Sequence, residues 1–591
     1  MNFIRSLSPF KTREQSAEIT PIVNELSQFE RFTTSDMASL LTYADVDFGS
    51  STQSKSANID QIIQIVHSKL KINGSNVDKI KEYSQTQTAV INYDTYKYIY
   101  VLSDVHSDFN SLFITLLQNN VIGLFQNSIK INDAEKIKIM TDIVTNYNVK
   151  EPNSRNPKYP FGKNKVDILK NILTMYDVKL IKANTLILVL GDIVDGRRTR
   201  SNDPRDEDSH IFEDVTNEYG LNELLIHILF YNMRIDSLGL NSNVMLELGN
   251  HEMMTIFDTT NPESYNNYVD LQTHLLFGSR AARRKILAPF YLFDSALFKL
   301  IVKNNKIVAY ASHGSFAGFD RADNAKYKAF TIDEYNGIFN MCKNDITRMY
   351  ETMGIIKTFD SKENLAKKSN LTITVSNFVW SRQFAEVLGK IDNPDTRPQQ
   401  NCGIVDTFAQ ENSFVLMGHC VVSSYVDQSA FKSKIKKGYE SCVDHSCIFA
   451  GCVKDNVPKI ILVDNTISYA NQEVNSGEAS IPALDPRFPT SKKKHIADKT
   501  GRYIKFIEML LLVKNNQSNN YNFIITRATF TKDDGTPDIR LDFKTLKKDN
   551  NVVLPDRIVT ANPYQPADQM GGYQAKYLKY KGKSDALKQV I

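Results

Sequence analysis

The sequence predicts an α/β fold in which a layered core of buried strands is flanked by helices. Short runs rich in Val, Ile and Leu recur along the chain, and each is followed by a turn that contains Gly, Asp or His. Runs of this kind are typical of buried strands, and the longer mixed segments between them leave room for helices. A chain of 591 residues with 42% hydrophobic and 23% charged residues can also bury such a core.

Six runs are the clearest strand candidates: 98–103, 186–190, 244–248, 307–312, 414–417 and 459–463. They predict a core over residues 92–532. Residues 1–91 are polar and partly helical in pattern and form an expected N-terminal extension, whereas 533–591 form an expected C-terminal tail that is polar and rich in Lys and Tyr. Between the first two strands, residues 118–181 predict an inserted subdomain, in which 133–147 has helical spacing.

The charge and the hydropathy pattern exclude several functional classes. The 71 Lys and Arg against 67 Asp and Glu give a net charge of +4, too small for this mass to indicate binding to nucleic acid or to a membrane. No apolar run approaches the roughly 20 residues that span a bilayer, and residues 1–10 lack the features of a signal peptide. We therefore expect an intracellular protein without a membrane or nucleic-acid partner.

Five of the six cysteines lie between Cys402 and Cys452. A zinc cluster could be formed by four residues of this region: Cys442, His445, Cys447 and Cys452. Their spacing lacks the paired C-x-x-C arrangement of strong zinc motifs, so reduced thiols packed near the core are the favoured interpretation.

Polar clusters follow most of the predicted strands. The first three strands end in Asp104-Val105-His106, in Gly191-Asp192-Ile193-Val194-Asp195 and in Gly249-Asn250-His251-Glu252, and the next two end in His313 and His419. Each cluster alone is more often a turn, a cap or a satisfied polar group. Together they indicate one site, because loops at the carboxyl ends of strands converge on one crevice. Carboxylate, imidazole and amide ligands suit Mn, Fe or Zn, and a carboxylate can bridge two ions, so a two-metal site is expected.

The ordered series D-x-H, G-D-x-x-D, G-N-H-[DE], a later His and a final G-H resembles that of the calcineurin-like metallophosphoesterases. The resemblance implies a layered β-sandwich core flanked by helices. Ser312-His313-Gly314 and the segment 418–422, which reads GHCVV, are similar to segments of the protein Ser/Thr phosphatase branch. Phosphodiesterase and nuclease branches usually end in G-H-x-H, and Val421 occupies the place of the second His. The phosphatase-like branch is therefore favoured.

The resemblance also implies a role for each polar residue of the series. Six residues would hold two divalent metal ions: Asp104, His106, Asp192, Asn250, His313 and His419. Asp104 and His106 would bind the first ion and Asp192 would bridge both, while the other three would complete the second. His251 would be the general acid that protonates the leaving oxygen, and Asp195 would orient and polarise it.

Two positions depart from the family pattern. The Gly that commonly follows D-x-H is Ser107 here, and the Arg that follows the second Asp of G-D-x-x-D in the phosphatases is Gly196. Arg197 and Arg198 come next and are the candidates for holding the substrate phosphate.

A third candidate for phosphate binding is Arg382, because Val379-Trp380-Ser381-Arg382 resembles the W-[ST]-R segment of bacterial and phage-type members. The alternative is that Trp380 packs in the fold and Arg382 forms a surface ion pair.

The leading hypothesis is a phosphatase that hydrolyses phosphomonoesters with a metal-activated water, with phosphoserine or phosphothreonine among its substrates. Its partner would be a phosphorylated protein or a small phosphate ester. Two alternatives are a hydrolase of nucleotides or dinucleoside polyphosphates and an inactive structural or virion protein with a phosphatase fold. The terminal KYLKYKGK at 576–583 resembles Lys/Tyr-rich ends of proteins from giant DNA viruses, which would place the chain in a host cytoplasm or a virion.

Overall fold

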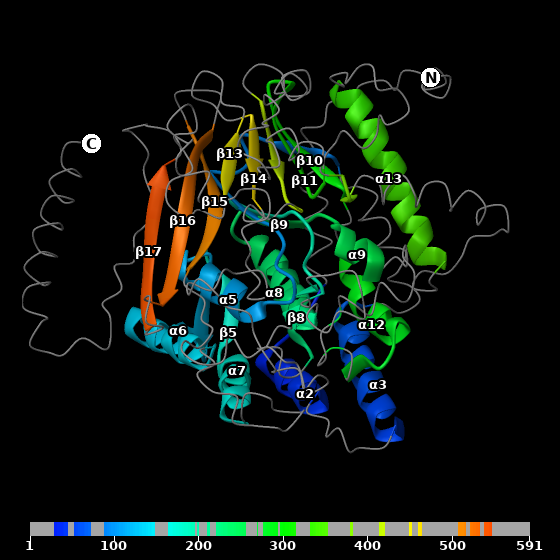
Figure 1. Ribbon diagram of the computed structural model, residues 1–591, viewed down its shortest axis with the longest axis vertical. Helices are drawn as coiled ribbons and strands as arrows, with labels where there is room; N and C mark the ends of the chain where they lie inside the picture. The colour runs from blue at the N-terminus through cyan, green and yellow to red at the C-terminus, as the bar shows by residue number, and fades with distance from the viewer. Residues whose placement is uncertain are drawn as a thin grey trace, which may run out of the picture.

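The computed structural model describes the following residues: 29–44, 52–71, 88–147, 163–195, 198–199, 210–212, 220–255, 269, 273, 276–292, 296–314, 331–352, 379–381, 413–419, 448–451, 459–463, 506–515, 521–531 and 537–545. Within these ranges the chain is a mixed α/β structure with two six-stranded sheets, two small sheets and surrounding helices (Figure 1). No helix in these ranges is long and apolar enough to cross a membrane. The cysteines considered for a zinc cluster and the segment 576–583 lie outside the described residues.

The first large sheet contains the first three predicted strands. Its order is β17 (Pro537–Thr545), β16 (Tyr521–Thr531), β15 (Phe506–Lys514), β2 (Tyr98–Leu102), β6 (Thr185–Val189) and β9 (Asn243–Leu246). β2, β6 and β9 run parallel, with Tyr98 opposite Thr185 and Leu186 opposite Asn243, whereas β15 is antiparallel to β2. The carboxyl ends of the three parallel strands therefore share one edge of the sheet.

The second large sheet contains the other three predicted strands. Its order is β1 (Val90–Asn92), β10 (Phe298–Lys303), β11 (Lys306–Ser312), β12 (Phe414–Met417), β14 (Ile460–Leu462) and β13 (Phe449–Gly451). β11, β12 and β14 are parallel to one another. All six predicted strands are thus confirmed, with ends that differ by at most two residues.

A hydrophobic cluster fills the space between the two large sheets. In β2 the side chains of Ile99 and Val101 belong to this cluster, whereas Tyr100 and Leu102 belong to the cluster on the opposite face. This division follows from the alternation of side chains along a strand. Phe414 of the second sheet and Phe523 of the first meet edge to face, with ring centroids 4.8 Å apart. The two sheets therefore pack face to face.

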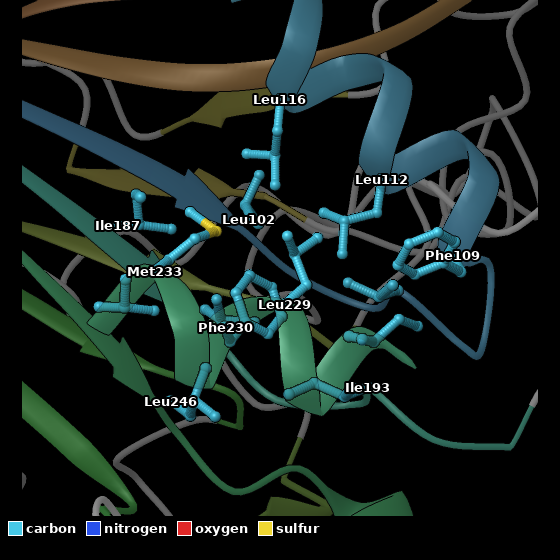
Figure 2. Packing of buried hydrophobic residues seen from close by; sticks show 14 of the residues in the cluster. Leu102, Phe109, Leu112, Leu116, Ile187, Ile193, Leu229, Phe230, Met233 and Leu246 are labelled. Carbon is cyan, nitrogen blue, oxygen red and sulfur yellow. The ribbon is translucent and has the colours of Figure 1, made fainter. Parts of the chain in front are cut away.

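Helices cover the outer face of the first sheet. Figure 2 shows Leu102, Ile187 and Leu246 of the sheet directed at the side chains of α5 (Phe109–Gln118) and α8 (Asn222–Ser237), which include Leu112 and Leu229. α5 begins directly after the first polar cluster because Asp108 caps it, accepting a hydrogen bond of 3.0 Å from the amide of Ser111. This cap fixes where the loop ends.

The segment expected to be an insertion forms elements of its own. β3 (Ile122–Gln126), β4 (Ile129–Lys130) and β5 (Asp177–Leu180) make a three-stranded sheet, and the predicted helix is confirmed as α6 (Asp133–Tyr147), followed by α7 (Lys163–Met175). The N-terminal helices α2 (Thr34–Ala44) and α3 (Thr52–Lys69) bury Leu40, Leu41 and Val66 in the hydrophobic cluster on the outer face of the first sheet. Figure 1 shows α2, α3, α6 and α7 grouped at the end of the molecule opposite the second sheet.

The described part of the segment expected as a C-terminal tail differs from that expectation. Residues 537–545 form β17, an edge strand that pairs with β16 in the first sheet. Ile539 and Leu541 are buried on one face, while the charged residues that alternate with them, Asp538, Arg540 and Asp542, give the segment its polar composition. A strand with one apolar face reads as polar when only composition is considered.

His227 of α8 lies in the core, outside the polar clusters. Its Nδ1 donates to the carbonyl oxygen of Glu223 at 2.6 Å and its Nε2 accepts from the hydroxyl of Tyr291 at 2.8 Å, which is the hydrogen-bond pattern of a neutral imidazole. Burial lowers the pKa of His227 to about 4 from an ordinary value of 6.5, although the carbonyl of Glu223 partly opposes the shift.

Acidification is therefore expected to destabilise the protein through His227. Because the pKa is lower in the folded state, the unfolded chain binds the proton more tightly, so this contribution is complete above about pH 6.5 and is lost as the pH falls towards 4. The loss is about 3 kcal/mol. The measurement is urea unfolding of the wild type and His227→Gln from pH 7.5 to 4. A difference in unfolding free energy that does not change with pH would contradict the prediction.

Candidate metal centre

The polar clusters lie in loops that follow five strands, and hydrogen bonds join several of these loops to one another. The loop after β6 holds the loop after β2 by two backbone hydrogen bonds. The amide of His106 donates to the carbonyl oxygen of Asp192 at 2.9 Å, and the amide of Ser107 donates to that of Ile193 at 2.8 Å. A hydrogen bond connects the two sheets: Nδ1 of His313, after β11, donates to the carbonyl oxygen of Leu190, after β6, at 2.6 Å. The carboxyl ends of the two sheets therefore form one site.

Backbone strain is concentrated at this site. Six of its residues adopt a positive φ without being glycine: Asp104 (52°), His106 (46°), Ser107 (64°), Asp192 (52°), Asp195 (69°) and His419 (64°). Each such conformation costs on the order of 1–3 kcal/mol for a residue with a side chain, and such residues cluster at functional sites. Gly191 (φ 81°) lies in the same region and cannot be replaced by a residue with a side chain, since a Cβ there would lie 2.4 Å from the amide nitrogen of Gly249.

Two overlapping groups of buried side chains could each hold a metal ion. One comprises His106, Asp192 and His251, and the other comprises Asp192, His313 and His419. Within each group the candidate ligand atoms lie within 4.8 Å of one another, and Asp192 belongs to both. This geometry fits the expectation that Asp192 bridges two ions.

The remaining two predicted ligands lie beside these groups. Asp104 Oδ1 is 3.6 Å from Nε2 of His106, and Asp104 Oδ2 accepts hydrogen bonds from the amide of His419 at 3.0 Å and from the hydroxyl of Ser103. Asn250 begins α9 (Asn250–Thr255), and its Oδ1 is 2.9 Å from Nε2 of His313. The structure therefore brings all six predicted metal ligands together.

The buried carboxylates of the site also favour the binding of cations. Asp104 and Asp192 are both 2% exposed, and in the described part of the chain their ion pairs are made only with histidines. Burial raises the pKa of Asp192, but the imidazoles of His313 and His251 lower it by more, and it lies well below its ordinary range. Burial lowers the pKa of His313, but Asp192 and Asp104 outweigh this and raise it to about 10. The negative charge of these buried carboxylates, which raises the pKa of His313, also attracts metal ions, and oxygen and imidazole ligands suit Mn, Fe or Zn.

The predicted pair of His251 and Asp195 is formed. Nδ1 of His251 is 2.8 Å from Asp195 Oδ2, which also accepts a hydrogen bond from the hydroxyl of Thr255 at 3.0 Å. Nε2 of His251 lies on the side of Asp192, 3.9 Å from its Oδ2. Burial raises the pKa of Asp195, but Arg283 and His251 lower it by more, so the carboxylate is anionic and holds a proton on Nδ1 of His251.

Sequence reasoning assigned no role to Glu252, although it ends the G-N-H-E cluster. Its carboxylate is fully buried and accepts four backbone hydrogen bonds, from Asp192 (2.8 Å), Gly249 (2.8 Å), Ile193 (2.7 Å) and Val194 (3.2 Å). Burial and the charge of Asp192 raise its pKa to about 7, against the effect of these amides. Glu252 therefore holds the loop after β6 in the strained shape that presents Asp192.

Replacing Glu252 with Ala is expected to cost on the order of 3–5 kcal/mol of unfolding free energy, because it leaves several buried amides without an acceptor. Glu252→Gln keeps one acceptor oxygen and is expected to cost less than Glu252→Ala. Urea unfolding of the three proteins measures both effects. Equal stability of Glu252→Ala and the wild type would show that this carboxylate does not hold the loop.

The predicted phosphate-binding arginines are less fully described. Arg197 and Arg382 lie outside the described residues, and Arg198 is described only by its backbone, in the short strand β7 (Arg198–Thr199). Trp380 packs against the core cluster, with its ring edge to face with His419 at 5.6 Å between centroids. The packing role of Trp380 is therefore observed, and Arg382 remains a prediction.

The chain has only weak similarity to known proteins. No family model and no curated protein matches the chain. Solved structures with a low similarity include a cold-active protein-tyrosine phosphatase of a psychrophilic Shewanella species, with 13% identity and a TM-score of 0.36 over 79% of this chain and 84% of that one. A point mutant of a cold-active protein tyrosine phosphatase gives 12% identity and a TM-score of 0.36 over 79% and 84% of the two chains, and a further cold-active enzyme structure gives 13% and 0.35 over 77% and 84%. At these scores the likeness assigns neither a fold family nor a function to this chain.

Proposed function

We propose that this chain is a two-metal phosphatase of the calcineurin-like metallophosphoesterase type that hydrolyses phosphomonoesters. The observation that supports it best is the sharing of Asp192 between two buried groups of candidate ligands. The face-to-face sheets that deliver these residues from their carboxyl ends fit the same proposal.

In this proposal the six predicted ligands hold the ions. Asp104, His106 and Asp192 hold the first, and Asn250, His313 and His419 complete the second. Two such ions, when bound, activate a water molecule and neutralise charge on the phosphoryl oxygens. Because Nδ1 of His251 is held by Asp195, its Nε2 is the atom that gives a proton to the leaving oxygen. Arg197, Arg198 and Arg382 are proposed to hold the phosphate.

Phosphoserine and phosphothreonine are the proposed substrates. Their leaving groups are alkoxides, which need a proton, and the site offers a buried imidazole fixed by a carboxylate.

The test is phosphate release by the metal-free protein after addition of Mn, Fe or Zn, together with the metal content of the reloaded protein. We expect two ions per chain and metal-dependent hydrolysis of a phosphoserine peptide and of 4-nitrophenyl phosphate. Nucleotides and a dinucleoside polyphosphate belong in the same panel, and a strong preference for them would replace the proposed substrate. Two bound ions without hydrolysis of any compound would indicate an inactive structural protein and contradict the proposal.

A further inference from the structure

A buried ion cluster lies behind His251. It comprises Arg283 of α12 (Arg280–Leu287), Glu223 in the first turn of α8 and Asp195, each at most 1% exposed. Arg283 Nε donates to Glu223 Oε2 at 2.7 Å and its Nη2 donates to Asp195 Oδ1 at 2.7 Å and to Glu223 Oε1. One guanidinium therefore serves two carboxylates, a task suited to its planar fork of donors.

Glu223 also anchors both loops that carry the first metal ligands. Its Oε1 accepts the amide of Asp195 at 2.8 Å and the hydroxyl of Ser107 at 2.9 Å. Ser107 stands where the related pattern commonly has Gly, and it adopts a φ of 64°. The hydroxyl thus provides a bond from the loop after β2 to Glu223 that a glycine lacks.

These contacts fix the carboxylate of Asp195 on both sides. Its Oδ1 faces Arg283, and its Oδ2 faces His251 and Thr255. A carboxylate held at both oxygens cannot rotate freely, so the imidazole bonded to it keeps one orientation and one tautomer.

We infer that Arg283 and Glu223 are positioning residues, which act through Asp195 to hold the His251 imidazole with Nε2 directed into the metal centre. The catalytic part of this inference rests on the proposed function, whereas the positioning of the ring does not. If the cluster served only to join α8 to α12, the loss of Arg283 would not change the orientation or the tautomer of the His251 imidazole.

The test observes the Nδ1 proton of His251 directly, by NMR of protein labelled with ¹⁵N-histidine. A proton held between His251 and Asp195 gives a protected downfield resonance, which His251→Gln identifies by its absence. Arg283→Lys keeps the charge and removes the fork. The double variant Glu223→Gln with Arg283→Met removes one charge of each sign. The net charge of the buried cluster is thereby unchanged, which limits the destabilisation that an additional unpaired carboxylate would cause. Lys285→Met is the matched control, because it removes an exposed cation from the same helix.

We expect the resonance in the wild type and in Lys285→Met, and its loss or broadening in both Arg283 variants. We also expect kcat with a phosphoserine peptide to fall roughly 10- to 100-fold in those variants, with a small change in KM. A wild type without the resonance, or an unchanged resonance in either folded Arg283 variant, would overturn the inference. If the wild type shows the resonance but hydrolyses nothing, the proposed function fails and the resonance still decides the positioning role.

Discussion

Asp192→Asn is expected to lose most of its bound metal and to lower phosphate release by roughly 1000-fold or more, since charge stabilisation by the ions is worth several kcal/mol and each 1.4 kcal/mol is tenfold in rate. Asp192 is the one residue common to both candidate ligand groups, and its Oδ2 lies within 4 Å of three imidazoles, 3.9 Å from Nε2 of His106, 3.9 Å from Nε2 of His251 and 3.3 Å from Nε2 of His313. Asn keeps the shape of the side chain and removes the charge. The measurements are metal content per chain and the rate of phosphate release at saturating Mn.

The control for Asp192→Asn is the same change at Asp133, whose side chain is 71% exposed at the start of α6. Asp133→Asn is expected to retain two ions and full activity. If Asp192→Asn kept two ions and wild-type rates, Asp192 would not be the bridging ligand and the two-metal proposal would be wrong.

His251→Asn is expected to lower kcat for a phosphoserine peptide by roughly 100- to 10,000-fold, the usual contribution of a positioned general acid. The effect on 4-nitrophenyl phosphate is expected to be much smaller, because its leaving phenolate is stable without a proton. Metal content is expected to be unchanged, since in the proposed arrangement His251 gives a proton and binds no ion. Rates with both substrates and metal content of the same samples measure all three effects.

This experiment also decides between two roles that the geometry allows for His251. The residue lies within one of the candidate ligand groups, so a ligand role would lower metal content and reduce the rates for both substrates equally. That outcome would contradict its assignment as the general acid. His67→Asn is the control, because it removes a half-buried imidazole outside the candidate ligand groups, whose Nε2 lies 2.9 Å from the carbonyl oxygen of Lys285.

The strands and the candidate metal ligands at their ends could be predicted from the sequence for a physical reason. Each buried strand is a continuous apolar run that ends in a polar turn, so the run and the polar side chains that follow it are adjacent in the chain. Asp104 after β2 and His419 after β12 are of this kind. Parallel strands then bring such ends together without any further information.

Residues that act from a distance could not be predicted in this way. Glu223 and Arg283 meet Asp195 from two helices, 28 and 88 positions along the chain, and neither follows a predicted strand. Glu252 was visible in its motif, but its role depends on four amides that become neighbours only when the loops after β6 and β9 are folded. β17 was missed because an edge strand with one apolar face resembles a polar segment in composition.

The sequence by itself determined the α/β class, the strands that form the core and the set of polar residues at their ends, because these depend on local hydrophobic pattern and spacing. The tertiary structure alone decided which of these residues face one another, that Asp192 is shared by two ligand groups, and that Glu223 and Arg283 lie behind Asp195 and His251. Such contacts depend on the packing of sheets and helices that are far apart in the chain. They exist only when burial of the hydrophobic clusters on both faces of the first sheet holds those elements together.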